Sequence, residues 1–80
     1  MRTEITEILR SLGKRVRHLR VRRGWSQEIL AEKADLDPTY VGDIERGQRN
    51  PSYLILAKLA KALNLSLPEM LRIKTGRGSP

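Results

Sequence analysis

The side chains that could do chemistry gather in one polar stretch, residues 26–52. Within it Thr39, Asp43, Arg46, Gln48 and Arg49 offer hydroxyl, carboxylate, guanidinium and amide groups. Such groups exchange hydrogen bonds with base edges and phosphate oxygens, and guanidinium groups also neutralise phosphate charge. The stretch has no paired carboxylates on a common face and no glycine-rich phosphate loop. Its chemistry is that of binding, with double-stranded DNA as the expected partner.

The remaining composition also argues against an enzyme. The chain has no cysteine, and its one histidine, His18, has no cluster of Cys, Asp or Glu to join as a metal ligand. We therefore expect no metal, no cofactor and no small-molecule ligand. No apolar run approaches the ~20 residues that cross a bilayer, and the N-terminus lacks the apolar core of a signal peptide. We expect a cytoplasmic protein without a membrane partner.

Positive charge is concentrated near the N-terminus. The chain has 16 Lys and Arg against 9 Asp and Glu, a net charge of +7, and its pI is about 10.6. Half of the basic residues lie before Trp25, where the only acids are Glu4 and Glu7. The electrostatic field of so many positive charges attracts polyanions. A charged run is often only a solvated helix face, but next to a DNA-binding motif contact with phosphates is the better interpretation.

A short helix is predicted to begin directly after Ser26, which can cap it. Trp25 before the cap and Leu30 inside the helix have the spacing of a hydrophobic staple. The apolar side of this helix consists of Leu30, Ala31 and Ala34. Asp35 follows it and must adopt the left-handed conformation, at a cost of about 1 kcal/mol. The helix therefore leads into a tight turn.

A second helix is predicted to begin at Pro38, with Asp37 as its cap, and to run to about residue 46. Val41 and Ile44 are spaced by three and form its inward side. The other side chains are small or polar and are expected to point outward. Gly47 can take a positive φ and end the helix. The outward side is the expected DNA-reading surface.

This pair of helices resembles the helix-turn-helix of the phage repressor and Cro-type family. Gln27 at the start of the first helix, Ala31 at the helix crossing and the Glu-Arg-Gly run at 45–47 fit that pattern, and the resemblance covers most of the chain. The run LDPTYVGDIERGQRNPS is similar to the controller proteins of restriction-modification systems. The resemblance implies a compact, all-α, five-helix domain that binds a pseudo-palindromic operator as a homodimer. Pro38 departs from the family, which often has a base-reading arginine there.

The outward orientation and the resemblance together indicate the contact residues. Base edges are expected to meet Pro38, Thr39, Gly42, Asp43 and Arg46. The acid Asp43 is expected either to accept a hydrogen bond from a cytosine or to repel phosphates and so restrict binding at wrong sites. Phosphates are expected to meet Gln27, Tyr40, Gln48, Arg49, Asn50 and Ser52, with Arg17 and Arg22 as helpers. In the family, the arginine one turn before Gly24, here Arg20, pairs with the glutamate at the position of Glu45. The resemblance therefore implies a structural ion pair between them.

Further helices are predicted on both sides of the motif. An amphipathic helix over residues 3–23 has a buried face of Ile5, Ile8, Leu9, Leu12, Val16 and Leu19. Gly13 costs about 1 kcal/mol inside it, so this helix is expected to fray or to begin properly only near Ser11. After Ser52 another helix is expected to bury Leu54, Leu56, Leu59, Ala60 and Leu63. Ser66 and Glu69 can form a capping box for a last helix. We expect one domain over residues 1–74 and a flexible tail over 75–80.

The last helix has more apolar surface than a small core needs. Its candidate interface residues are Leu65, Leu67, Met70 and Leu71. A single module of this size buries too little surface to reach the typical specific affinity of about 10⁻⁸ M or better. We therefore expect a symmetric homodimer, with operator half-sites about one helical turn apart.

Two alternatives remain beside this interpretation. An antitoxin or a coactivator-type adaptor can use the same fold to bind a protein. An antitoxin usually has a separate toxin-binding segment, and only the short tail after Ile73 is spare here. The basic first helix could also bind a membrane surface, but its apolar stripe is better used as core.

Overall fold

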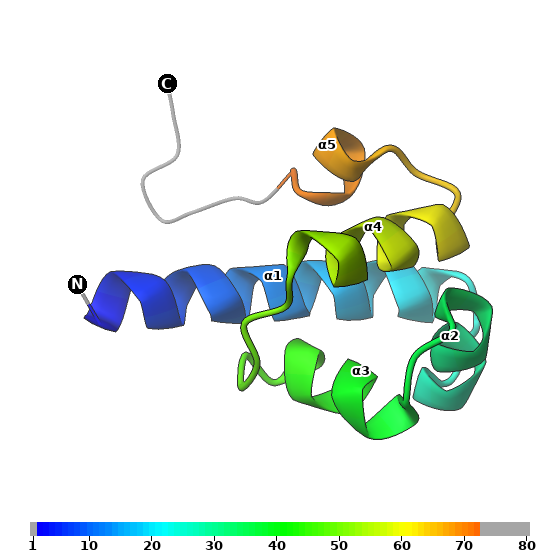
Figure 1. The fold of residues 1–80 in the computed structure, drawn as a ribbon, viewed down its shortest axis with the longest axis horizontal. Coiled ribbons are helices and arrows are strands. Elements are labelled where there is room, and N and C mark those ends of the chain that lie inside the picture. The colour runs from blue at the N-terminus through cyan, green and yellow to red at the C-terminus, as the bar shows by residue number, and fades with distance from the viewer. Residues whose placement is uncertain (1, 73–80) are drawn as a thin grey trace.

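The computed structural model describes residues 2–72, and these form five helices (Figure 1). The helices are α1 (Arg2–Arg22), α2 (Gln27–Ala34), α3 (Pro38–Glu45), α4 (Tyr53–Ala62) and α5 (Leu67–Met70). α3 packs on α1 and on α2, while α4 packs on α2 and on α5. The expected all-α, five-helix fold is confirmed. The predicted tail at 75–80 lies outside the described residues.

Side-chain caps define where the four shorter helices begin. Ser26, Asp37, Ser52 and Ser66 each accept a hydrogen bond from a backbone N–H in the first turn of the following helix. Such caps satisfy N–H groups that have no partner inside the helix. Asp35 takes the left-handed conformation between α2 and α3, with φ 58° and ψ 49°. The predicted helix starts and the predicted turn are therefore confirmed.

α1 runs without interruption from its first turn to Arg22, so the expectation that Gly13 would loosen it is wrong. Gly13 is buried where α1 crosses the end of α3. A Cβ atom there would collide with the carbonyl oxygen of Ile44 and lie only 2.5 Å from that of Glu45. The missing side chain lets the two helices approach closely. This packing outweighs the helix-propensity cost of about 1 kcal/mol.

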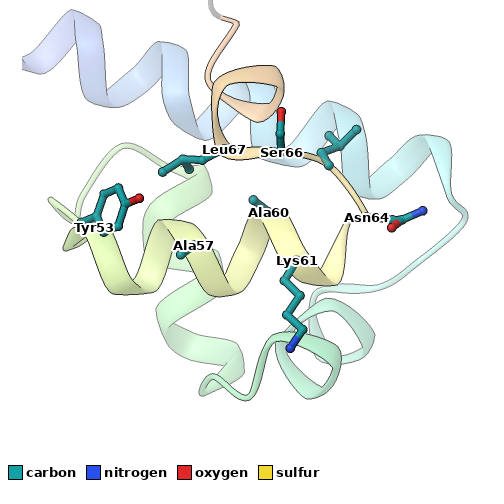
Figure 2. A pocket seen from close by; sticks show the side chains of 8 residues that line it. Tyr53, Ala57, Ala60, Lys61, Asn64, Ser66 and Leu67 are labelled. Carbon is teal, nitrogen blue, oxygen red and sulfur yellow. The ribbon is translucent and has the colours of Figure 1, made fainter.

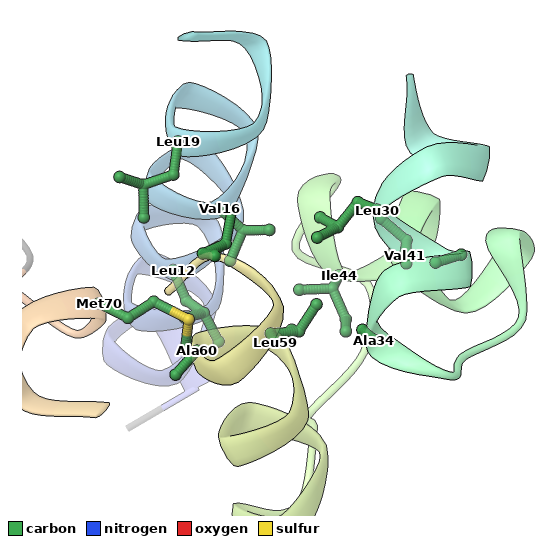
Figure 3. Close-up of a cluster of buried hydrophobic side chains, with 12 residues drawn as sticks. Leu12, Val16, Leu19, Leu30, Ala34, Val41, Ile44, Leu59, Ala60 and Met70 are labelled. Carbon is green, nitrogen blue, oxygen red and sulfur yellow. The ribbon is translucent and has the colours of Figure 1, made fainter. Parts of the chain in front are cut away.

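One apolar core lies between α1 and the other helices (Figure 3). Its largest fully buried side chains are Val16, Leu30, Val41, Ile44, Leu59, Leu63 and Met70. Met70 was expected at a dimer interface, and this expectation is wrong because the side chain closes the monomer core.

Arg15 holds α5 in place, since its guanidinium donates to the carbonyl oxygens of Glu69 (2.9 Å) and Met70 (3.2 Å).

Three apolar side chains that were expected in the core lie on the surface. Ile5 and Ile8 are 50% and 56% exposed. They lie on the N-terminal turns of α1, which extend past the other helices (Figure 1). Leu54 is 63% exposed in the first turn of α4. The periodic pattern identified the correct helices, but not how far the other helices cover them.

Candidate nucleic-acid interface

A buried ion pair fixes the end of α3 on α1. Arg20 Nε lies 2.7 Å from Glu45 Oε2, and Arg20 Nη2 donates to Glu45 Oε1 at 2.9 Å. The two side chains are only 10% and 3% exposed. The hydrogen bonds to Glu45 raise the pKa of Arg20 above its ordinary value. This is the ion pair that the family resemblance implies.

The same pair also holds the start of α2. Arg20 Nη1 donates to the carbonyl oxygen of Trp25 at 2.7 Å. Gln27 Nε2 donates to Glu45 Oε1 at 3.1 Å, so this predicted phosphate contact also joins α2 to α3. The buried hydrogen bonds give α3 a fixed position relative to α1 and α2. A helix that is already held rigidly loses less conformational entropy when it binds a ligand, so binding costs less free energy.

The first two side chains of α3 are open to solvent, whereas Val41 in the same turn is buried. Pro38 and Thr39 are exposed, as is Arg46 directly after the helix. Gly42 differs from the expectation, because it is buried. A Cβ atom there would lie 3.2 Å from Arg46 Nη1 and 3.3 Å from Gln27 Oε1. The side chains of Gln27 and Arg46 therefore lie over Gly42, and it does not form an open surface.

Five predicted contact residues meet in one group on α3 and the loop after it. The Asp43 carboxylate accepts from Arg46 Nη2 at 2.5 Å and from Arg49 Nη2 at 3.1 Å. Arg46 Nε also donates to Gln48 Oε1 at 3.2 Å, and the Arg49 guanidinium lies 4.3 Å from the ring centroid of Tyr40. The side chains of Arg46 and Arg49 are 55% and 45% exposed. We call these five residues the Asp43 cluster.

The remaining predicted contacts lie at unequal distances from this cluster. Asn50 and Ser52 are exposed in the same loop, and the Ser52 hydroxyl oxygen caps α4. Arg17 is exposed four residues after Gly13, on the side of α1 near α3. Arg22 follows Gly13 by nine residues, or two and a half turns, so it lies on the opposite side of α1. The structure does not bring Arg22 to the site.

Arg10 was not among the predicted contacts, but it lies beside the loop that follows α3. A Cβ atom at Gly47 would lie 3.0 Å from Arg10 Cγ, so the stem of this exposed arginine packs against the turn. Arg10 precedes Gly13 by three residues and shares its side of α1. That spacing could have identified it, but only with the knowledge that Gly13 faces α3.

Away from α3, a hollow of about 420 Å³ opens between α4 and α5 (Figure 2). Tyr53, Ala57, Leu65 and Leu67 provide much of its lining. Leu65, Leu67 and Leu71, which were predicted at a dimer interface, are half-buried, and Tyr53 is 75% exposed. Tyr53 was not among the residues predicted at the interface. Its place in the first turn of α4 beside α5 became visible only in the fold.

Two other kinds of feature are absent from the part of the chain that the structure describes. Between residues 2 and 72, no helix is long and apolar enough to span a bilayer. In the same range, no three side chains of His, Cys, Asp or Glu gather as possible metal ligands. His18 lies exposed on α1 beside Lys14 and Arg17.

Comparison with known proteins identifies the family. A helix-turn-helix family model matches residues 16–70. The control protein C.SmaI of Serratia marcescens is 45% identical over 65 residues, which cover 81% of this chain and 77% of that protein. The crystal structure of the restriction-modification controller protein C.AhdI from Aeromonas hydrophila is 48% identical, with a TM-score of 0.76 over 78% of this chain and 94% of that one. The controller protein C.Esp1396I, solved as a tetramer in complex with its natural 35 base-pair operator, is 36% identical, with a TM-score of 0.73 over 80% of this chain and 88% of that one. The chain thus belongs to the helix-turn-helix family of DNA-binding transcriptional regulators, as its resemblance to controller proteins implied.

Proposed function

We propose that this protein is a controller-type regulator that binds a pseudo-palindromic operator as a homodimer, with α3 in the major groove. The observation that carries the proposal is the Asp43 cluster, which presents two arginines on a helix end that the buried Arg20–Glu45 pair holds in place. The likeness to control proteins supports the same function. We expect the protein to act on operator DNA in the cytoplasm of a bacterial cell, by binding and not as an enzyme.

Base reading is assigned to the exposed first turn of α3 and to Arg46. The Thr39 hydroxyl can donate to a base edge, and its methyl group can meet a thymine methyl. Arg46 can offer two N–H groups to O6 and N7 of a guanine, the most common specific contact in the major groove. The Pro38 ring has no donor and can make only apolar contacts.

Phosphate contacts are assigned to the loop after α3 and to the start of α2. The residues are Gln27, Tyr40, Gln48, Arg49, Asn50 and Ser52, with Arg10 and Arg17 from α1. Most of these side chains are exposed and several are hydrogen-bond donors. Because they lie on both sides of the α3 surface, these side chains are suited to contact the DNA backbone. Such contacts would fix the register in which α3 reads the bases.

The proposed dimer interface is the hollow between α4 and α5. It combines the half-buried Leu65 and Leu67 with the exposed Tyr53. Leu71 does not line the hollow, and Met70 belongs to the core. A two-fold interface uses the same patch on both subunits, so one apolar face is sufficient. Dimerisation doubles the DNA contact and raises affinity into the specific range.

Selection of bound duplexes from a random-sequence pool tests the function. The expected result is an enriched inverted repeat whose half-sites lie about one helical turn apart. Absence of any enriched sequence would contradict specific binding. An enriched sequence without two-fold symmetry would contradict the dimer while leaving DNA reading intact.

Sedimentation of the Leu67→Glu variant tests the interface. An unpaired charge in an apolar interface is costly, so this variant is expected to sediment as a monomer and to bind the selected operator more weakly, with its helical content unchanged. Ile8→Glu is the matched control, because Ile8 is 56% exposed on α1 and does not line the hollow. A dimer that persists in Leu67→Glu would place the interface elsewhere.

A further inference from the structure

Asp43 was expected either to read a base or to repel phosphates at wrong sites, but both of its carboxylate oxygens already accept hydrogen bonds from arginines. Oδ1 accepts from Arg46 at 2.5 Å, and Oδ2 accepts from Arg49 at 3.1 Å. The Asp43 side chain is 21% exposed, which is much less than either arginine. An ionised carboxylate only accepts hydrogen bonds, so its natural partners here are the two guanidinium groups.

Each arginine also has a second contact that does not involve Asp43. The Arg49 guanidinium stacks on Tyr40, 4.3 Å from the ring centroid. Arg46 Nε donates to Gln48 Oε1 at 3.2 Å. Tyr40 and Gln48 can therefore keep the guanidinium groups near their positions when another anion takes the place of Asp43.

We propose that Asp43 is a specificity-determining residue that competes with DNA for Arg46 and Arg49, and so weakens binding to random sequence more than binding to the operator. The inference rests on the proposed function, because it requires α3 to approach a DNA duplex. It assigns Asp43 a role toward its neighbouring arginines instead of a contact with a base.

The physical reason lies in what each kind of DNA offers in exchange. A phosphate at an arbitrary position only replaces the carboxylate as the anionic partner of an arginine, so this exchange contributes little binding free energy. An operator adds correctly placed base edges, such as the two acceptors of a guanine, and only this addition outweighs the loss of the carboxylate.

Binding of the Asp43→Asn variant to two duplexes tests the proposal. The probes are a 30-base-pair duplex of random sequence and the operator recovered by selection, each titrated over a range of KCl concentrations. Asp43→Asn is expected to bind the random duplex about tenfold more tightly and to steepen its salt dependence by about one phosphate contact. Operator affinity is expected to rise less, so the ratio of specific to random affinity falls. Asp43→Glu, which restores the charge, is expected to bind like the original protein.

Asp35→Asn is the matched control for net charge. It removes the same charge from a carboxylate that is 97% exposed, 3.8 Å from Lys58 and not paired with Arg46 or Arg49. Asparagine also tolerates the left-handed conformation of this position. Far-UV circular dichroism of each variant verifies that the helices persist. Equal behaviour of Asp43→Asn and Asp35→Asn on both duplexes would overturn the proposal.

A second comparison separates competition for the arginines from simple repulsion of DNA by Asp43. In a chain that carries Arg46→Gln and Arg49→Gln, Asp43→Asn is expected to tighten random binding no more than the Asp35→Asn control does. A full tenfold gain in that chain would show repulsion without competition and would overturn the proposal. Failure of the unmodified protein to bind either duplex would instead refute the proposed function, and this inference with it.

Discussion

Two groups of ion pairs meet on α3, and they differ mainly in burial. Glu45 faces α1 and pairs with Arg20, where the two side chains are 3% and 10% exposed. Asp43 faces outward and pairs with Arg46 and Arg49, which are 55% and 45% exposed. Both groups use the same carboxylate and guanidinium chemistry. The difference shows that burial decides whether such a pair serves the fold or stays available to a ligand.

The energies of the two groups should differ for the same reason. Removal of one partner of a buried pair leaves an uncompensated charge and costs about 3–5 kcal/mol. Exposed pairs contribute about 0–1 kcal/mol, because water and salt screen them. A buried pair therefore resists exchange, whereas an exposed pair can give up its anion to DNA.

Glu45→Ala is expected to have the largest effect. It leaves Arg20 and Gln27 without their partner and should lower the free energy of unfolding by about 3 kcal/mol. Urea denaturation followed by circular dichroism measures this loss. Asp43→Ala, the matched variant of the exposed group, should cost less than about 1 kcal/mol. Equal losses in the two variants would remove the distinction between the groups.

Gly13→Ala tests the close helix crossing that lets the buried pair form. Helix propensity alone predicts a gain of about 1 kcal/mol, but the new Cβ atom would overlap the carbonyl oxygens at the end of α3. We expect a net loss of about 1–2 kcal/mol, the usual cost of overpacking, visible as a lower melting temperature. Thr6→Ala, at an exposed position of α1, should instead stabilise slightly. A stabilising effect of Gly13→Ala would mean that the crossing is looser than described.

Arg49→Ala tests the exposed group without disturbing the core. We expect about tenfold weaker binding to every duplex and a salt dependence reduced by about one phosphate contact. The unfolding free energy should change by less than about 0.5 kcal/mol, because the side chain is 45% exposed. Fluorescence anisotropy over a range of KCl concentrations, together with urea denaturation, measures both quantities. A change in base preference at one position would place Arg49 in the groove.

Arg22→Ala is expected to have the smallest effect. Arg22 lies on the side of α1 opposite α3, so DNA affinity should change by less than about twofold and the salt dependence should stay the same. The same anisotropy titration measures it, with Arg17→Ala as the comparison on the side near α3. A larger loss for Arg22→Ala than for Arg17→Ala would mean that DNA approaches from the other side.

The sequence by itself determined the local features of the fold. The caps at Ser26, Asp37, Ser52 and Ser66 each join atoms two or three residues apart, so residue type and spacing are sufficient to predict them. The left-handed Asp35 is local in the same sense. The helix-turn-helix pattern also led to the predicted contact residues that the fold gathers in the Asp43 cluster.

Only the tertiary structure decided which surfaces meet. From the sequence, Gly13 was expected to destabilise its helix, but in the fold the end of α3 packs directly against it. Periodicity predicted a buried Leu54, and the excess of apolar residues in the last helix predicted an interfacial Met70, but the structure exposes the first and buries the second. Asp43 looked free to read a base until its arginines were placed beside it. A periodic pattern shows which side of a helix is apolar. Whether a side chain is buried, and which charged partner it meets, depends on which distant segments of the chain pack against that side.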